Sequence, residues 1–476
     1  MKYEPVIGLE VHAQLSTESK MFCACSTKFG ANPNENTCPV CLGLPGALPT
    51  INAKAVDYAI LMGLATNCEI RLDSQFARKN YFYPDLPKAY QTSMFDRPIC
   101  ENGWVDIEVG GKTKRIGITR IHMEEDAGKL IHDGQDPNAS YADLNRASVP
   151  LIEIVSEPDI RTSEEAKAYM EKIHSFVTYL GVCNGDMEKG NLRCDANVSI
   201  RPVGQEEFGT RTESKNLNSF RNVAQAIDAE IARQTDELLD GGSIRLETRL
   251  WDADNRVSKA LRAKEESHDY RYFPCPDLPV VLISKEQVDK LQASLPELPD
   301  QKAERFQAEH GLSKYDANVL VASKKVAFFF EEAVKKGADA KQANNWINGD
   351  LAKFLKDAKQ NIEECKVTTD HLVELLALIE DGTISGKIAK TVFEEVFNTG
   401  KTAASVVDEK GLKQMSDSGE LEAVCQAIVD ANPDNVAAFK GGKEKLFGFF
   451  VGQVMKETKG QGNPKMINEI LKKLLA

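Results

Sequence analysis

The stretch Leu192-Arg-Cys-Asp-Ala-Asn-Val-Ser-Ile200 decides the fold of the first part of the chain. Apolar and polar residues alternate along it, which is the period of a β-strand with one buried face. Leu9-Glu-Val-His-Ala-Gln-Leu15 alternates in the same way and would present its three polar side chains on one face. Leu151-Ile-Glu-Ile-Val155 is apolar except for Glu153, which indicates a buried strand that carries a carboxylate. This part of the chain therefore predicts a sheet with acids on its strands.

Helix signals interrupt these strands. Thr162 and Glu165 have the spacing of a capping box, and an apolar stripe of helical period follows them. A second helix is expected from about residue 219 to the glycine pair at 241–242. Because strands and helices are mixed without a regular βαβ alternation, the sequence predicts an α+β fold.

Composition divides the chain into three parts. Prolines gather between residues 274 and 299, and the pattern beyond them is helical. A second boundary is expected near residues 366–370, where an all-helical tail begins. We therefore expect domains at residues 1–295, 296–365 and 366–476.

The bulk composition excludes several classes of protein. The 476 residues are 42% hydrophobic, enough for several cores, and carry a formal net charge of −13. An acidic protein is a poor general binder of nucleic acid, so RNA would have to meet a local basic patch. No signal-peptide pattern opens the chain, and no run approaches the ~18 apolar residues of a membrane span. We expect a cytoplasmic protein without a membrane anchor, in which eleven cysteines are reduced thiols or metal ligands.

Two cysteine pairs suggest a metal centre in an insert at residues 23–41. Cys23 and Cys25 form the first pair, and Cys38 and Cys41 follow after twelve residues. Four thiolates can surround one tetrahedral zinc ion, and four protein ligands make such a site structural. The first pair is one residue tighter than usual, and four reduced, buried cysteines are the alternative. We favour zinc.

Five polar segments place acids on or beside strands whose other face is apolar: residues 10–12, 120–129, 153–159, 193–197 and 213–216. Carboxylates suit Mg²⁺, which bridges them to substrate phosphates, and interspersed Arg and Lys would neutralise phosphoryl oxygens. For any single segment a solvated strand face is the simpler explanation. Together they indicate a site, because carboxylates in runs that otherwise look buried are costly without a cation.

The known nucleotide loops are missing. Residues 382–387 are one residue short of a P-loop, and residues 111–113 fit a hairpin turn better than a phosphate loop. Aromatic residues alternate with Arg and Lys in residues 76–91 and 268–274, which can stack a base and contact phosphates. Loops whose tyrosines pack on the sheet are an equal alternative.

The end of the chain is locally basic. Residues 431–476 hold eight lysines and four acids, in a protein of net charge −13. Lysines separated by glycines suit a phosphate backbone that is recognised by its shape. A solubilising surface is the alternative.

Several long motifs of this sequence closely resemble the B-subunit family of the bacterial aspartyl/glutamyl-tRNA amidotransferase. They are residues 7–12, 78–91, 122–129, 145–159, 213–218 and 264–274. The resemblance covers essentially the full length. It implies a cradle domain related in fold to glutamine synthetase, then a helical domain and a tRNA-binding tail.

The resemblance also implies the activity. Family members use ATP and Mg²⁺ to phosphorylate the side-chain carboxylate of Glu or Asp misattached to tRNA(Gln) or tRNA(Asn). Ammonia from the amidase A subunit then displaces phosphate, and a small C subunit completes the heterotrimer. This chain shows no glutaminase cysteine or amidase signature, which agrees with ammonia from a partner. The alternatives are a non-catalytic tRNA-binding scaffold and a zinc hydrolase, although four cysteines would leave zinc no open position.

Carried onto this sequence, the family's roles fall on the following residues. Catalysis is expected at Glu10, His12, Glu125, Glu153, Arg193, Asp195, Glu213 and Lys215. Magnesium is expected at His12, Glu124, Glu125 and Glu153. The nucleotide is expected at Arg78, Lys79, Tyr83, Lys88, Asn197 and Ser199. tRNA is expected at Lys440, Lys443, Lys445, Lys456, Lys459 and Lys465. The four cysteines match the zinc-bearing branch of the family.

Overall fold

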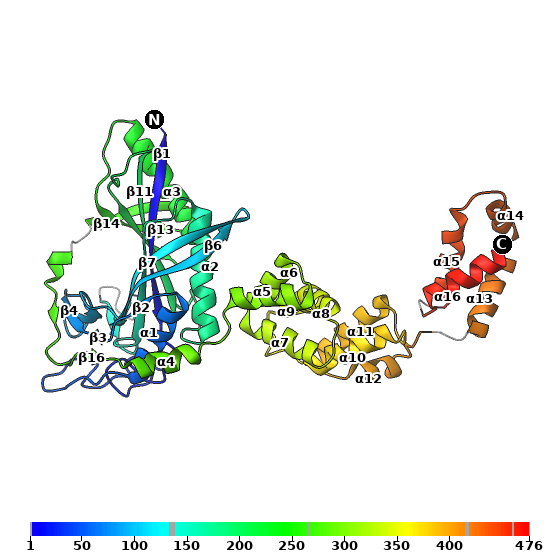
Figure 1. The fold of residues 1–476 in the computed structure, drawn as a ribbon, viewed down its shortest axis with the longest axis horizontal. Helices are drawn as coiled ribbons and strands as arrows, with labels where there is room; N and C mark the ends of the chain where they lie inside the picture. Colours follow the sequence, from blue (N-terminus) through cyan, green and yellow to red (C-terminus); the bar gives the residue numbers. More distant parts are fainter. Residues whose placement is uncertain (1, 133–138, 264–266, 415–417, 459–460, 476) are drawn as a thin grey trace. The chain divides into compact units, whose positions relative to one another are not determined.

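The computed structural model describes residues 2–132, 139–263, 267–414, 418–458 and 461–475. The chain forms two compact units, Met1–Leu298 and Pro299–Ala476. A large mixed sheet with helices makes up the first unit, and the second is helical, which confirms the α+β class (Figure 1).

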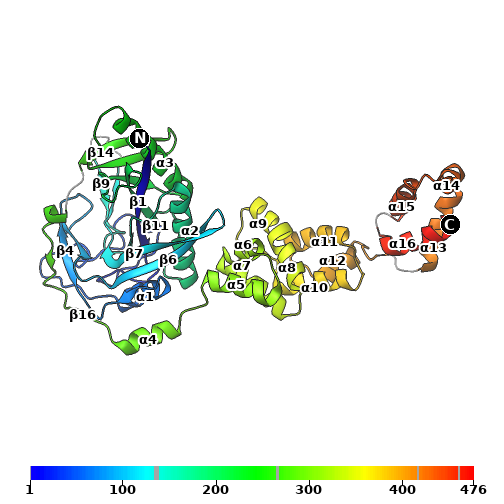
Figure 2. The same cartoon turned by 45° about the horizontal axis from the view of Figure 1, so that its top comes forward.

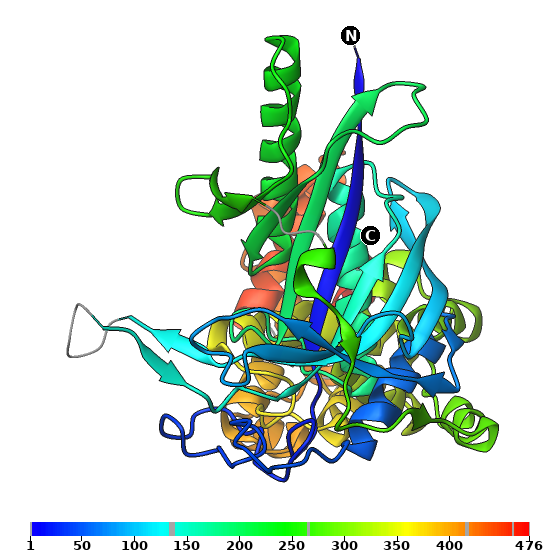
Figure 3. The same ribbon diagram turned by 90° about the vertical axis from the view of Figure 1, so that its left-hand side faces the viewer.

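One 12-stranded sheet organises the first unit. Its main path runs β14-β13-β12-β11-β1-β10-β7-β5-β4-β15, and β6 pairs with both β7 and β2. The long strands β1 (Tyr3–Gln14) and β11 (Leu192–Pro202) lie side by side at its centre (Figure 3). The other strands are β2 (Glu69–Ile70), β4 (Phe76–Asn80), β5 (Tyr90–Met94), β6 (Cys100–Val109), β7 (Lys112–Glu125), β10 (Pro150–Ser156), β12 (Thr212–Leu217), β13 (Glu247–Asp252), β14 (Val257–Ala263) and β15 (Phe273–Pro274). Two further pairs are β3 (Asp73–Ser74) with β16 (Val281–Leu282), and β8 (Lys129–Ile131) with β9 (Tyr141–Asp143).

The apolar and polar residues that alternate in the sequence lie on opposite faces of the strands. Leu9, Val11 and Ala13 of β1 are buried in the core, together with Cys194 and Val198 of β11. Helices α1 (Ala53–Ala65), α2 (Ser163–Leu180) and α3 (Phe220–Leu239) pack on this apolar side (Figure 2). The intervening polar side chains therefore point to the other face of the sheet.

Helix α2 begins as the sequence predicts, with one difference. Thr162 is the N-cap, and its side chain accepts a hydrogen bond from the N–H of Glu165 (3.1 Å). The Glu165 carboxylate accepts its bond from the N–H of Arg161 (2.7 Å) and not from the N-cap residue. In a capping box this second hydrogen bond would come from the N–H of the N-cap residue, whereas here it comes from the residue before the N-cap. Helix α3 begins after the N-cap Ser219, as expected.

The proline-rich segment at residues 274–299 is partly structured, since it holds β16 and α4 (Lys285–Ala293). A short 3₁₀ helix (Ser267–Tyr270) precedes it, and β15 leads into it. The hairpin favoured over a phosphate loop at residues 111–113 is present: residues 110–111 form the turn between β6 and β7, and Lys112 begins β7.

The second unit contains two hydrophobic cores. The first is built by α5 (Pro299–His310), α6 (Lys314–Val321), α7 (Lys324–Lys335), α8 (Ala340–Trp346), a π-helix (Ile347–Leu351), α9 (Ala352–Ala358), α10 (Thr369–Glu380), α11 (Gly386–Thr399) and α12 (Ala403–Glu409). The second is built by α13 (Ser418–Asp430), α14 (Pro433–Lys440), α15 (Leu446–Glu457) and α16 (Pro464–Leu475). The first core continues across the boundary expected near residue 366. Among the described residues, no helix has the length and apolarity to cross a membrane.

Candidate functional site

The register of the central strands gathers acids from five segments on one face of the sheet. Glu10 of β1 lies opposite Asp195 of β11, and His12 lies between Arg193 and Glu153 of the two neighbouring strands. In an antiparallel pair, residues directly opposite each other point to the same face. The strands therefore bring together side chains that are up to two hundred residues apart in the sequence.

The first cluster joins β1, β7 and β10. His12 Nε2 lies 3.3 Å from Glu153 Oε2 and 3.6 Å from Glu124 Oε1. His122 Nε2 lies 3.4 Å from the same Glu153 oxygen, and its Nδ1 accepts a hydrogen bond from Arg120 Nε (3.3 Å). One ligand atom each of His12, Glu124 and Glu153 fall within 4.8 Å of one another, so these three side chains could hold a metal ion.

The electrostatics of this cluster favour an added cation. Burial would lower the pKa of His12, but the carboxylates of Glu153 and Glu124 raise it to about 9. Against the effect of burial, His122 and His12 hold the pKa of Glu153 well below its usual range. Burial and the nearby Glu153 charge raise the pKa of Glu124. The two carboxylates thus compete for positive charge that the histidines only partly provide.

The second cluster joins β1, β11 and β12. Ligand atoms of Glu10, Asp195 and Glu213 also lie within 4.8 Å of one another. Lys215 Nζ lies 2.5 Å from Asp195 Oδ2 and 3.4 Å from Glu213 Oε1. Burial lowers the pKa of Lys215, but Asp195 and Glu213 raise it above its usual value, so the lysine is a cation. Oxygen donors in this arrangement fit Mg²⁺, and the lysine beside them fits a phosphate.

Two neighbours fix the carboxylates of this cluster. Asn197 Nδ2 donates to Glu10 Oε1 (2.8 Å), and Thr248 Oγ1 donates to Glu213 Oε2 (2.8 Å). Thr248 is a residue of β13 with 1% exposure, and Glu213 has 7%. These hydrogen bonds take one oxygen of each carboxylate.

A groove of about 480 Å³ continues from the second cluster along the same face. Asn197 and Ser199 line it, and the exposed ring of Phe208 stands at its side. Gly8, which has no side chain, also lines it. A groove with an aromatic side and amide and hydroxyl groups can take a flat heterocycle such as a nucleobase.

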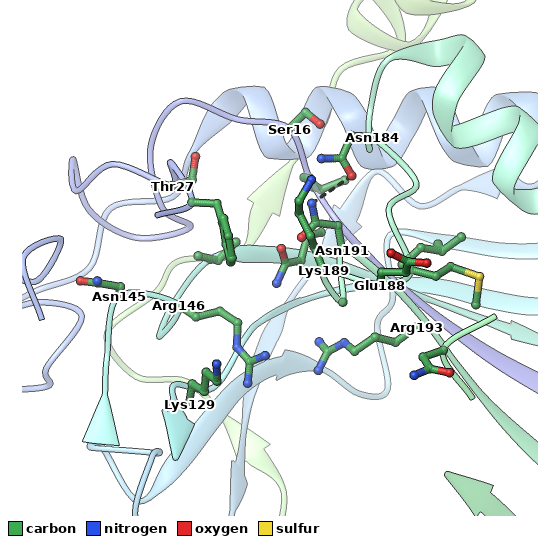
Figure 4. A pocket seen from close by; sticks show the side chains of 18 of the residues that line it. Ser16, Thr27, Lys129, Asn145, Arg146, Asn184, Glu188, Lys189, Asn191 and Arg193 are labelled. Carbon is green, nitrogen blue, oxygen red and sulfur yellow. Dashed lines mark hydrogen bonds between the residues drawn. The ribbon is translucent and has the colours of Figure 1, made fainter. Parts of the chain in front are cut away.

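A larger cleft of about 800 Å³ adjoins the second cluster at Asp195, near the ends of β1 and β11 (Figure 4). Its basic side chains are Lys28, Lys129, Arg146, Lys189 and Arg193. In Figure 4 the guanidinium groups of Arg146 and Arg193 point toward each other. Between them lies the buried Asp126, 3.1 Å from Arg193 and 3.6 Å from Arg146. Asp126 also accepts a hydrogen bond from Gln14 Nε2 (2.7 Å), and these partners lower its pKa against the effect of burial.

Other expected site residues lie on the opposite face, because successive side chains of a strand alternate. Glu125 follows Glu124 on β7 and accepts hydrogen bonds from Lys88 and from the N–H of Thr92 (2.8 Å). Arg78 pairs with Asp277 (2.5 Å) and lies over the ring of Tyr90. The structure thus separates Arg78, Lys88 and Glu125 from the two acid clusters.

Two further residues of this stretch differ in their setting. Lys79 lies on the site face, 4.7 Å from the Tyr270 ring centre and near enough to Glu124 to influence its charge. Tyr83 is a half-exposed loop residue. Of the basic residues in this stretch, Lys79 therefore lies on the face of the acid clusters, whereas Arg78 and Lys88 lie on the other face.

The four cysteines meet in one cluster. Their sulfur atoms lie within 4.8 Å of one another, and Cys38 and Cys41 are 3.9 Å apart. With metal–sulfur bonds of ~2.3 Å, a tetrahedron has sulfur–sulfur edges of ~3.8 Å. The hydrogen bond with Cys23, the Cys38 backbone and the Lys20 ammonium lower the pKa of Cys41 to about 5, against the effect of burial. The donor set and its spacing fit a structural zinc ion.

The expected tRNA contacts lie on a small helical surface. Lys440, Lys443, Lys445, Lys456 and Lys465 are all exposed, around a core that includes Phe450 and Leu471. Lys459 lies outside the described residues, as do residues 264–266 of the motif at 264–274.

Sequence reasoning assigned no role to several residues that the site contains. Asp126 and His122 occur in a motif that the sequence singled out, but only the fold shows that they contact Arg193 and Glu153. Nothing in the sequence around Thr248 indicates a role in the site, because its hydrogen-bond partner Glu213 lies on another strand. A threonine in an alternating run looks the same whether it meets water or a carboxylate.

Comparison with known proteins gives matches along the whole chain. The family described as the GatB/GatE catalytic domain matches residues 5–289, and the family described as the GatB domain matches residues 328–475. The B subunits of aspartyl/glutamyl-tRNA(Asn/Gln) amidotransferases from three organisms are similar over the full length. That of Syntrophotalea carbinolica is 57% identical over 474 residues, which are 100% of this chain and 99% of its own. That of Solidesulfovibrio magneticus is 58% identical with the same coverage, and that of Geobacter sulfurreducens is 57% identical over 100% of both chains.

Proposed function

The chain belongs to the GatB family, the B subunits of aspartyl/glutamyl-tRNA(Asn/Gln) amidotransferases, and we propose that it carries out the ATP-dependent transamidation of misacylated tRNA. It is a component of a ligase that acts in protein biosynthesis, for which we propose a cytoplasmic setting. The observation that carries the chemical part of the proposal is the convergence of two acid clusters on one sheet face. A scaffold that only presents tRNA has no need of such clusters, since buried carboxylates without a cation are costly.

The proposed reaction has two steps. The side-chain carboxylate of Glu or Asp attached to tRNA(Gln) or tRNA(Asn) attacks the γ-phosphorus of ATP, an O–P bond forms, and ADP leaves. Ammonia then attacks the acyl carbon, a C–N bond forms, and phosphate leaves as the nitrogen loses a proton. The products are the amide on tRNA, ADP and phosphate.

Each part of the site supports one part of this reaction. The acid clusters, through residues such as Glu153 and Asp195, would hold Mg²⁺, whose positive charge would offset that of the phosphate groups. Lys215 and Arg193 lie beside the clusters and would meet phosphate oxygens as fixed cations. The groove at Asn197 and Ser199 would hold the nucleoside of ATP, with Phe208 beside the base. The cleft at Arg146 and Arg193 would take the aminoacylated end of the tRNA.

The remaining parts of the proposal concern the partners and the support of the site. An amidase A subunit supplies ammonia, and a small C subunit joins the complex. Cys23, Cys25, Cys38 and Cys41 would bind a structural zinc ion. The sheet domain would be a cradle of the glutamine synthetase type.

The substitution Glu153→Gln tests the catalytic proposal. In the complex with its partners, we expect ATP-dependent phosphoryl transfer to fall by about 10³-fold, because the amide cannot replace a charged ligand beside His12. ADP formed with misacylated tRNA and ammonia measures this, and filter binding measures tRNA affinity. Glu69→Gln, an exposed acid of β2, is the matched control. Unchanged turnover with Glu153→Gln would favour the scaffold alternative.

The tail proposal needs a test that leaves the cores intact. A deletion from residue 366 would cut through the first helical core, so charge substitutions are more informative. We expect Lys440, Lys443 and Lys445 changed together to Gln to weaken tRNA binding and to lower its salt dependence. Glutaminase activity of the partner should not change. If the variant and the wild type bind tRNA with the same affinity and the same salt dependence, these lysines are not part of the tRNA interface.

A further inference from the structure

Lys20 is a lysine in an unusual position. Its side chain is almost fully buried, with 1% of its surface exposed. Lysine is rarely buried in this way unless its charge has a partner. Among the described residues, no carboxylate lies within ion-pairing distance of its ammonium group, which distinguishes Lys20 from Lys88, whose side chain is 9% exposed and pairs with Glu125.

The contacts of Lys20 lead to the cysteine cluster. Its Nζ lies 3.6 Å from Cys41 Sγ and 3.3 Å from the carbonyl oxygen of Leu144. Its backbone N–H donates to the carbonyl oxygen of Cys25 (3.0 Å). Lys20 therefore contacts both cysteine pairs, one through its backbone and the other through its side chain.

The charge of the cluster explains the burial of this lysine. Four cysteine thiolates around a divalent ion carry a net charge of −2, since four negative charges meet two positive ones. A buried ammonium beside them recovers favourable Coulomb energy, whereas the same ammonium beside four neutral thiols would be uncompensated. Groups that surround a metal centre in this way orient its ligands and tune its affinity.

The second contact of Lys20 joins the cluster to the wall of the 800 Å³ cleft. Leu144 lies between Asp143 and Asn145, which line that cleft. The loop between the two cysteine pairs is bonded to the same place. The N–H of Leu144 donates to Asn34 Oδ1 (2.8 Å), and the N–H of Asn36 donates to Asn145 Oδ1 (2.8 Å).

We propose that Lys20 is a positioning residue: its ammonium is the built-in counter-charge of a zinc–tetrathiolate centre, holds Cys41 as a ligand, and ties the centre to Leu144 in the cleft wall. The inference rests on the zinc site proposed above. Bound zinc would then stabilise the wall of the cleft as well as the loop that carries the cysteines. Loss of the charge at residue 20 weakens zinc binding although no ligand has been removed.

The test compares Lys20→Met with the wild type in the full-length protein. Methionine keeps an unbranched side chain of similar length and removes the charge. We expect an affinity for zinc about 10–100-fold lower, which competition with a chromophoric chelator measures. The Co²⁺-substituted protein reports the thiolate–metal charge-transfer bands as a second readout. Lys54→Met, an exposed lysine on α1, is the control and should bind zinc like the wild type.

A second variant keeps the test decisive if Lys20→Met does not fold. Lys20→Arg retains the charge, so we expect zinc binding much closer to that of the wild type. Equal affinities of the wild type and Lys20→Met would overturn the role of Lys20 while leaving the zinc site in place. A loss with Lys20→Arg as large as with Lys20→Met would show that shape matters and not charge, which also overturns it. A wild-type protein that binds no zinc would overturn the zinc site itself.

Discussion

Glu124 and Glu125 are neighbours at the end of β7, yet they lie on opposite faces of the sheet. Their partners also differ: Glu125 has a lysine, whereas Glu124 lies among histidines and a second carboxylate. Glu125 accepts hydrogen bonds from Lys88 and from the N–H of Thr92. Glu124 lies near the carboxylate of Glu153, and the His12 ring lies 3.6 Å from it. Both carboxylates are almost completely buried, with 3% and 1% exposure.

The difference shows that burial of a charge does not by itself mark a functional site. The Glu125 carboxylate has the Lys88 ammonium as its counter-charge and joins two segments of the fold, although its Oε2 atom accepts no hydrogen bond from the described residues. A buried carboxylate that shares histidines with a second carboxylate still needs positive charge. The nature of the partner therefore distinguishes the site face from the core face, and each of the following changes tests that distinction.

The substitution Glu124→Gln should have the largest effect, and it should fall on activity. We expect phosphoryl transfer by the complex to drop by about 10²–10³-fold, because one charged oxygen donor of the proposed Mg²⁺ site is lost. The free energy of unfolding without Mg²⁺ should stay equal or rise, since repulsion with Glu153 is relieved. ADP formation and urea denaturation with a chelator measure the two quantities. Activity within twofold of the wild type would place the metal elsewhere.

The substitution Glu125→Gln should act on stability. We expect a loss of about 3–5 kcal/mol in the free energy of unfolding, because Lys88, with 9% side-chain exposure, is left without its charge partner. Urea denaturation is the measurement. The double variant with Lys88→Met should recover part of the loss, as a double-mutant cycle requires of a coupled pair. A loss below about 1 kcal/mol would mean that this pair resembles an exposed one.

Much of this architecture could be predicted from the sequence, and the reason is periodicity. The alternation in residues 9–15 and 192–200 indicated the strands β1 and β11 and the face of each polar residue. The caps Thr162 and Ser219 indicated the starts of two helices. These signals depend only on neighbouring residues in the sequence, so they can be recognised without knowledge of the fold.

The pairing of acids could not be predicted in the same way. Glu124 and Glu125 occupy adjacent positions with the same side chain, and only the register of β7 against β10 decides which one meets Glu153. Asp195 and Glu213 meet because β11 and β12 are adjacent, and that adjacency is a property of the sheet. The first helical core has residues on both sides of residue 366, and composition could not indicate this, because it does not show which helices pack together.

The substitution Asp126→Asn tests whether the effect of a buried carboxylate on activity depends on its charge partner or on the face of the sheet where it lies. Asp126 adjoins the cleft on the site side, but it has the fixed partners Arg193 and Arg146. We expect KM for misacylated tRNA to rise about 10-fold with little change in kcat, because hydrogen bonds between charged groups contribute ~1.5–3 kcal/mol. Asp106→Asn is a matched control, since Asp106 pairs with Arg115 at an exposed position. A fall in kcat like that of Glu124→Gln would make the face the deciding property.

The smallest expected effect belongs to Thr248→Val, which removes one hydroxyl and keeps the shape. The Thr248 hydroxyl donates to Glu213 Oε2 at 2.8 Å, and this bond restrains the orientation of a carboxylate in the second cluster. A single hydrogen bond of this kind contributes ~1–1.5 kcal/mol, so the concentration of Mg²⁺ at half-maximal activity should rise about 5–10-fold. Thr248→Ser retains the hydroxyl and should behave like the wild type. If both the valine and the serine variant behave like the wild type, the Thr248 hydroxyl does not set the orientation of Glu213. The ion pair with Lys215 then becomes the contact to test, and this carboxylate would resemble Glu125, which has a lysine partner.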